Sequence, residues 1–148
     1  MGCRILLADQ AHFMRRMLGQ LLAQEGHEVV AEAADGREAV ELYQRHSPDV
    51  VILDVCLPEV DGIAVTAALC SADPRARVII CTAVADPATL RRAVAAGARD
   101  FLVKPISRER LVTALRAVAA GGGVWSPPGR MRAAGGAAGG AAGGAAGR

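Results

Sequence analysis

Long apolar runs are absent from this sequence of 148 residues. Arg, Asp or Glu interrupts every apolar stretch, so none approaches the roughly 18 to 20 residues that span a bilayer. The first basic residue is followed by only four apolar ones, residues 5–8, which is too short for the apolar core of a signal peptide. We therefore expect a cytoplasmic protein that does not insert into a membrane.

Aromatic residues are scarce, at 3% of the chain, and cysteines are few. The four cysteines are Cys3, Cys56, Cys70 and Cys81. They form neither a CxxC pair nor a cluster with histidine, and this spacing predicts reduced, mostly buried thiols in a cytosolic protein.

Most of the chain has no excess of positive charge, although the formal net charge is +2. Residues 1–120 hold 14 basic and 15 acidic groups, a net charge of −1, whereas residues 121–148 hold three arginines and no acid. Residues 121–148 also contain 11 of the 17 glycines. We predict one domain over 1–120 and a low-complexity, disordered Gly/Ala-rich tail over 121–148. The basic isoelectric point is then no argument for nucleic-acid binding, and we expect none.

Two hydrophobic periods alternate along the domain. Short and mostly continuous apolar runs, typical of strands buried on both faces, occur at 5–8, 29–33, 50–53, 78–81 and 101–103. Between them lie segments with helical spacing. The first places Phe13, Met17, Leu18, Leu21 and Leu22 on one face, and the others span 37–46, 63–71, 88–96 and 108–119. Five such units predict an α/β fold, a doubly wound five-stranded parallel sheet with helices on both faces.

The ends of the predicted strands carry the polar side chains of interest, because a doubly wound sheet places its site at the carboxyl ends of the strands. They are Asp9 and Gln10, Asp54, Thr82 and Ala83, and Lys104 and Pro105. Two carboxylates, a hydroxyl and an ammonium group converging at one edge suit phosphoryl chemistry, in which an aspartate acts as the nucleophile. Carboxylates also hold hard divalent cations, and Lys and Thr can hold the remaining phosphoryl oxygens.

In order and spacing, these residues resemble the receiver domain of bacterial two-component response regulators. The motifs are ILLAD at 5–9, FMRR at 13–16, AADGREA at 33–39, DVVILDVCLPEVDG at 49–62, CTA at 81–83 and GARDFLVKP at 97–105. The resemblance covers about residues 4–120 and implies a CheY-like, flavodoxin-like (βα)5 fold with the strand order 2-1-3-4-5.

The resemblance also implies roles for the acidic residues. Asp54 corresponds to the phosphoacceptor, Asp9 to an acid near Mg²⁺, and the backbone carbonyl of Cys56 to a further metal ligand. Most active receivers carry a second acid where this sequence has Gln10. An amide oxygen can bind Mg²⁺ but brings no charge, so we predict weakened metal binding at a site that can still be phosphorylated.

The remaining implied roles concern switching. Thr82, followed by Ala83, corresponds to the hydroxyl that follows the phosphoryl group, and Lys104 contacts that group. Phe101 corresponds to the aromatic residue that turns inward on activation, and the Lys104–Pro105 peptide bond is expected to be cis.

Taken together, the sequence predicts a stand-alone, CheY-like receiver that is a phosphorylation switch rather than an enzyme. A sensor histidine kinase or phosphotransfer protein would phosphorylate Asp54, with Mg²⁺ as cofactor. A downstream protein would bind the surface of the fourth helix, fifth strand and fifth helix. The resemblance implies that the residues two beyond the acceptor and two beyond Thr82 position the hydrolytic water. Here they are Cys56 and Val84, which orient water poorly, so we also predict slow self-dephosphorylation. Two alternatives stay open: a phosphorylation-independent pseudo-receiver, favoured by Gln10, and a regulator that has lost its DNA-binding output domain.

Overall fold

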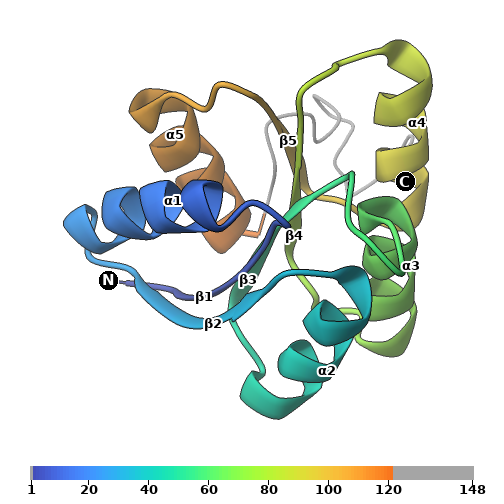
Figure 1. Ribbon diagram of the computed structural model, residues 1–148, viewed down its shortest axis with the longest axis horizontal. Helices are drawn as coiled ribbons and strands as arrows, with labels where there is room; N and C mark the ends of the chain where they lie inside the picture. The colour runs from blue at the N-terminus through green and yellow to red at the C-terminus, as the bar shows by residue number, and fades with distance from the viewer. Residues whose placement is uncertain (1, 122–148) are drawn as a thin grey trace.

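Five parallel strands alternate with five helices in the computed structural model, which describes residues 2–121 (Figure 1). The strands are β1 (Arg4–Ala8), β2 (Glu28–Ala33), β3 (Val50–Asp54), β4 (Val78–Thr82) and β5 (Asp100–Val103). The helices are α1 (His12–Gln24), α2 (Gly36–His46), α3 (Gly62–Ala72), α4 (Pro87–Ala96) and α5 (Arg108–Ala119). Each predicted strand is confirmed to within one residue at either end.

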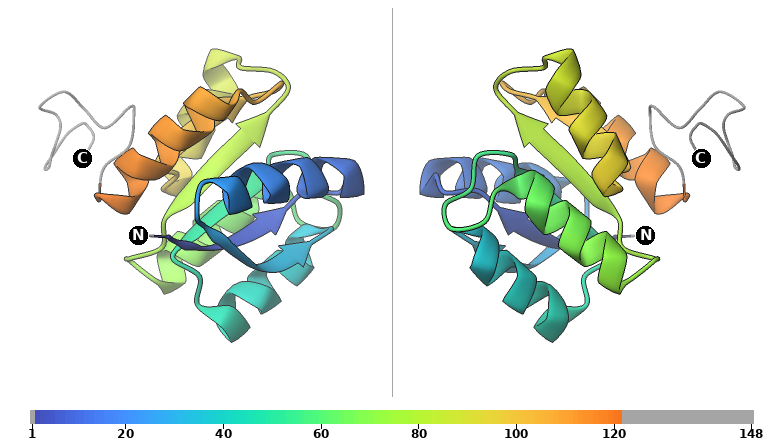
Figure 2. Two further views of the ribbon diagram at one scale, coloured as in Figure 1. Left: turned by 90° about the vertical axis from the view of Figure 1, so that its left-hand side faces the viewer. Right: turned by 90° about the vertical axis from the view of Figure 1, so that its right-hand side faces the viewer.

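The strand order is β2-β1-β3-β4-β5, as predicted, and all four neighbouring pairs are parallel. Helices α1 and α5 cover one face of the sheet, and α2, α3 and α4 cover the other (Figures 1 and 2). Strands β3 and β4 are buried along their whole length, which is why their sequences are continuous apolar runs rather than alternating ones.

Alternating side chains of the strands feed two separate cores. Leu6, Leu53 and Ile80 pack toward α2, α3 and α4. Their neighbours Ile52 and Ile79 pack toward α1 and α5. Successive side chains of a strand point to opposite faces, so one five-stranded sheet supports both layers and its carboxyl edge is held from both sides.

Local signals in the sequence set the helix ends. Asp61 accepts a hydrogen bond from the Ala64 amide at the start of α3, and Ser107 caps α5 through the Arg110 amide. The caps satisfy amides that have no partner within the helix. Gly97 ends α4 with φ of 111°, a left-handed conformation that glycine adopts without strain.

The predicted inner face of α1 is wrong in one residue. Phe13 is 75% exposed, whereas Leu18 and Leu22 are buried and Met14 and Leu21 pack beside them. Phe13 precedes Met14 by one residue, about 100° around the helix, so its ring points away from the sheet. Apolar periodicity alone does not distinguish the edge of a helix face from its centre.

The predicted tail over 121–148 lies outside the described residues, apart from Gly121 in the turn after α5. Among residues 2–121, no helix has the length and apolar character needed to cross a membrane.

Candidate functional site

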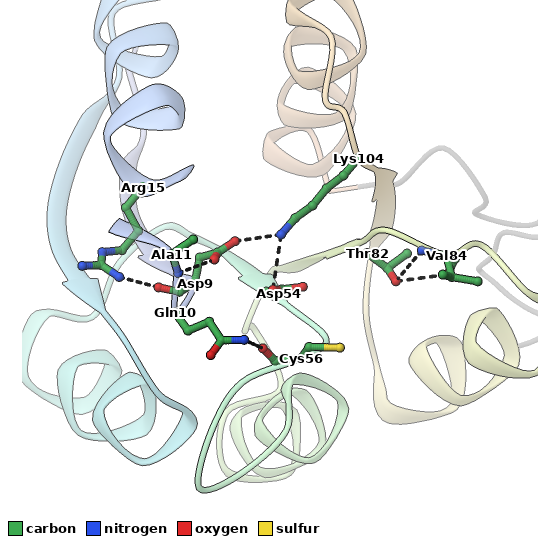
Figure 3. Close-up of polar contacts among 9 residues, drawn as sticks. All are labelled: Asp9, Gln10, Ala11, Arg15, Asp54, Cys56, Thr82, Val84 and Lys104. Atoms are coloured by element: carbon green, nitrogen blue, oxygen red, sulfur yellow. Dashed lines mark hydrogen bonds and ion pairs between the residues drawn. The ribbon is translucent and has the colours of Figure 1, made fainter. Parts of the chain in front are cut away.

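An aspartate–lysine–aspartate cluster forms at the carboxyl edge of the sheet. Asp9 follows β1 and Asp54 ends the neighbouring strand β3, whereas Lys104 follows β5, one strand beyond β4, and its long side chain reaches both carboxylates. The Lys104 Nζ atom lies 3.0 Å from Oδ2 of Asp9 and 3.3 Å from Oδ2 of Asp54 (Figure 3). The two carboxylates are only 6% and 9% exposed. One ammonium group therefore bridges two buried negative charges.

The pKa values of Asp54 and Lys104 reflect this arrangement. Burial raises the pKa of Asp54 and the charge of Asp9 raises it further, whereas Lys104 and the Cys56 amide oppose the rise. Burial lowers the pKa of Lys104, but its hydrogen bond to Asp9 and the charges of both carboxylates outweigh that effect and leave it raised. The site holds more negative charge than Lys104 neutralises, and it therefore favours an additional cation.

Arg15 of α1 links the main chain at Asp9 to strand β2. Its Nη1 atom donates to the backbone carbonyl of Asp9, and its Nε atom pairs with Glu32 of β2 at 3.0 Å. The Ala11 amide donates to Oδ1 of Asp9 at 2.8 Å. These contacts hold both the main chain and the carboxylate of Asp9, and the motif analysis gave Arg15 no role. Its signal was present only as a basic residue in the FMRR motif, in the first turn of an amphipathic helix.

Gln10 lies beside Cys56 on the open side of the cluster. The Gln10 Nε2 atom donates to the Cys56 carbonyl at 3.4 Å, so the side-chain amide faces the oxygen predicted as a metal ligand (Figure 3). No group of three or more His, Cys, Asp or Glu side chains that could hold a metal forms within residues 2–121.

The residues present nevertheless suit a hard divalent cation. Asp9 and Asp54 supply two carboxylates whose charge Lys104 only partly neutralises, and Cys56 supplies a backbone carbonyl. Oxygen ligands of this kind suit Mg²⁺, which keeps several of its waters in protein sites. The donor set therefore fits Mg²⁺ with one acid fewer than the resemblance implies.

Thr82 and Phe101 contact residues outside the charged cluster. The Thr82 hydroxyl donates to the Val84 carbonyl at 3.0 Å and accepts from the Val84 amide at 3.2 Å, so in this state it is bound to its own loop (Figure 3). Phe101, on β5, is 6% exposed, and its ring packs in the core beneath α4 rather than among the polar side chains at the carboxyl edge of the sheet. Ala83 is exposed beside Thr82, and the Lys104–Pro105 bond is cis, as expected.

The expectation of mostly buried cysteines is wrong. Cys81 alone is fully buried, and burial raises its pKa to about 12. Cys3 and Cys70 are partly exposed, and Cys56 is exposed at the site. Cys56 follows the end of β3 by two residues, in the loop before α3, where a side chain is no longer packed by the sheet.

The geometry and the family comparison agree. The family model for the response regulator receiver domain matches residues 5–116. The chain therefore belongs to the response regulator receiver domain family.

Similar proteins narrow the class. The chain is 44% identical to the chemotaxis protein CheY of Thermotoga maritima over 80% of its own length and 98% of that protein. It is also 44% identical to CheY of Bacillus subtilis, over 78% and 96% of the two chains. The chain is therefore a CheY-like, phosphorylatable two-component receiver, and CheY-like receivers are signalling switches.

Solved structures support the same class. The receiver domain of the putative response regulator NarL from Mycobacterium tuberculosis superposes with a TM-score of 0.78 at 36% identity, covering 81% of this chain and 98% of that one. CheY in the CheX–CheY–BeF3–Mg complex from Borrelia burgdorferi gives 0.75 at 32% identity, covering 78% and 87%.

Proposed function

We propose that the protein accepts a phosphoryl group on Asp54 from the phosphohistidine of a sensor histidine kinase or phosphotransfer protein. The observation that carries this proposal is the buried Asp9–Lys104–Asp54 cluster at the carboxyl edge of the sheet. An Oδ atom of Asp54 attacks phosphorus, the phosphorus–nitrogen bond breaks, and the imidazole leaves with the electron pair. The product is an aspartyl phosphate.

The other members of the cluster stabilise the transferred charge. Lys104 already contacts an Asp54 oxygen and would hold a phosphoryl oxygen after transfer. Asp9, Asp54 and the Cys56 carbonyl would hold Mg²⁺, with Gln10 as a weak neutral ligand. Bound Mg²⁺ offsets negative charge on the phosphoryl oxygens.

The output we propose is a change in protein binding. Thr82 would exchange its hydrogen bonds with Val84 for one to the phosphoryl group, and Phe101 would report this change to the surface of α4, β5 and α5. That surface exposes Val94 and Val103, at 47% and 45%, and such exposed aliphatic side chains favour a protein partner.

A second candidate is a phosphorylation-independent receiver that binds partners in one fixed state. The contact between Gln10 and the Cys56 carbonyl favours it, because an amide donor occupies the oxygen that a metal would use. In that case the cluster of buried charges would be structural.

Transfer from a phosphohistidine donor separates the two candidates. A histidine kinase labelled with radioactive phosphate is incubated with the wild-type chain, Asp54→Asn and Asp35→Asn, with Mg²⁺ present. Asp35 is the matched control, an acid that caps α2 and that Asn replaces as a cap. We expect label on the wild type and Asp35→Asn but not on Asp54→Asn. Equal labelling of all three, or of none with every kinase and small acyl phosphate tested, would contradict the proposal.

A further inference from the structure

Arg110 connects the first turn of α5 to the main chain of β5. Its Nη2 atom donates to the Phe101 carbonyl at 2.9 Å and to Oδ1 of Asp100 at 2.8 Å. Its Nη1 atom lies 3.5 Å from Oδ2 of the same carboxylate. Oδ1 of Asp100 also accepts from the Phe101 amide at 2.7 Å. Both main-chain polar groups of Phe101 are therefore linked, directly or through one carboxylate, to a single guanidinium.

The burial of Asp100 makes this link difficult to replace. Asp100 is 1% exposed, and Arg110, about one third exposed, is its ion-pair partner among the described residues. A buried carboxylate without a partner is strongly unfavourable, so Asp100 holds Arg110 where its fork also reaches Phe101. A lysine in the same place could donate to one of these acceptors, but it lacks the planar guanidinium that binds the Asp100 carboxylate and the Phe101 carbonyl together.

The side chain of Phe101 occupies the opposite core. It packs in the cluster that contains Ile80 of β4 and Ala93 of α4. The rotamers open to a ring depend on the φ and ψ angles of its own residue, so contacts that fix the β5 backbone at Phe101 limit the positions its ring can take. The residue that fixes the backbone of Phe101 therefore also biases its ring.

We propose that Arg110 is a positioning residue that holds the Phe101 ring inside the core through its contacts with Asp100 and the Phe101 carbonyl. This inference rests on the proposed function only in giving Phe101 a part in switching. It assigns to α5 a direct role in setting the state of β5, which neither the motifs nor the comparisons assign.

The two phenylalanines of the chain provide a direct test. The full-length protein labelled with fluorophenylalanine gives two fluorine resonances, one from exposed Phe13 and one from buried Phe101, which Phe13→Leu assigns. The solvent isotope shift between water and deuterium oxide measures the exposure of each ring. Arg110→Gln removes the link. Arg110→Lys keeps the charge beside Asp100 and so protects the fold.

Arg108→Gln is the matched control, since Arg108 lies in the same turn of α5 but pairs with Glu25, the residue that follows α1, at 2.6 Å. We expect the Phe101 isotope shift to rise toward that of Phe13 in Arg110→Gln and Arg110→Lys and to stay at the wild-type value in Arg108→Gln. A Phe101 resonance that keeps its wild-type position and isotope shift in the folded Arg110→Lys protein overturns the proposal. So does an equal change in Arg108→Gln.

Adding acetyl phosphate and Mg²⁺ separates this inference from the proposed function. If phosphorylation favours the inward ring, the isotope shift of Phe101 in Arg110→Lys falls back toward the wild-type value. If neither acetyl phosphate nor a phosphorylated histidine kinase transfers a phosphoryl group to Asp54, the proposed function fails, whereas the role of Arg110 is still decided by the spectra without the donor.

Discussion

The folded protein disfavours the charged form of Asp54. Its carboxylate is buried and faces the charge of Asp9, and Lys104 is shared between the two. The folded-state pKa of Asp54 is consequently raised above its ordinary value of 3.8. The proton preference of this group favours folding below that ordinary value, and the benefit is lost as the pH rises through the folded-state pKa.

Replacing Asp54 with Asn should therefore stabilise the protein at neutral pH. We expect Asp54→Asn to raise the free energy of unfolding by about 1 to 2 kcal/mol, because Lys104 keeps Asp9 as a partner and one buried charge disappears. The gain should shrink as the pH falls toward 3.8, because the raised pKa of Asp54 favours the protonated, neutral form there. Urea unfolding at neutral and acidic pH measures both. Asp35→Asn should change little, and an Asp54→Asn protein that is less stable at neutral pH would refute this account of the site.

Gln10 determines how strongly the site binds a cation. Gln10→Asp adds a third negative charge near Asp9 and removes the amide that donates to Cys56. We expect the Mg²⁺ concentration for half-maximal phosphorylation by acetyl phosphate to fall roughly tenfold, the effect of about 1.4 kcal/mol. Titration of phosphorylation rate with Mg²⁺ tests this, and an identical Mg²⁺ dependence in both proteins would rule it out.

At the scale of elements, the loop after β3 depends on close backbone approaches. A Cβ on Gly62 would lie 2.1 Å from the carbonyl oxygen of Asp54 and 2.8 Å from Cδ1 of Leu53. Its amide donates to the Val55 carbonyl at 2.8 Å. The absence of a side chain thus lets α3 begin directly against the strand end that carries Asp54.

Substituting Gly62 with Ala should disturb both stability and the site. We expect Gly62→Ala to lower the free energy of unfolding by about 2 to 3 kcal/mol, because backbone atoms must move to admit the methyl group. Gly19→Ala is the control: nothing lies within 4 Å of its Cβ position in α1, so better helix propensity should stabilise it by about 0.5 to 1 kcal/mol. Thermal or urea unfolding of the wild type, Gly62→Ala and Gly19→Ala measures both effects. Equal stability of the two variants would contradict the prediction.

Sequence patterns were sufficient for the elements but not for all of their contacts. Short apolar runs located every strand, most clearly β3 and β4, which are buried on both faces, and least clearly the half-buried edge strand β2, whose run contains Glu32. The outward position of Phe13 could not be predicted from apolar spacing. Spacing groups residues on one side of a helix but does not show which of them the sheet covers. The contact of Arg110 with Asp100 was also missed, because two residues ten apart on a strand and a helix obey no local spacing rule.

At the scale of the whole molecule, one sheet joins the proposed acceptor to the proposed binding surface. Strand β4 ends at Thr82 beside the cluster, and β5 carries Phe101 beneath α4 and Lys104 into the cluster. A change at Asp54 can therefore bias the packing of α4 and α5 as a shift between two populated states. The assignment of residues 121–148 to a tail and the location of the partner surface stay predictions.

The central claim is that Asp54 forms an aspartyl phosphate, and reductive trapping measures it directly. The protein is treated with acetyl phosphate and Mg²⁺, then with borohydride, which reduces an acyl phosphate to the alcohol and leaves homoserine in place of aspartate. Peptide sequencing by mass spectrometry locates the product. We predict homoserine at position 54, only when donor is present. Trapping at another residue, or none at position 54 at any Mg²⁺ concentration, would contradict the account.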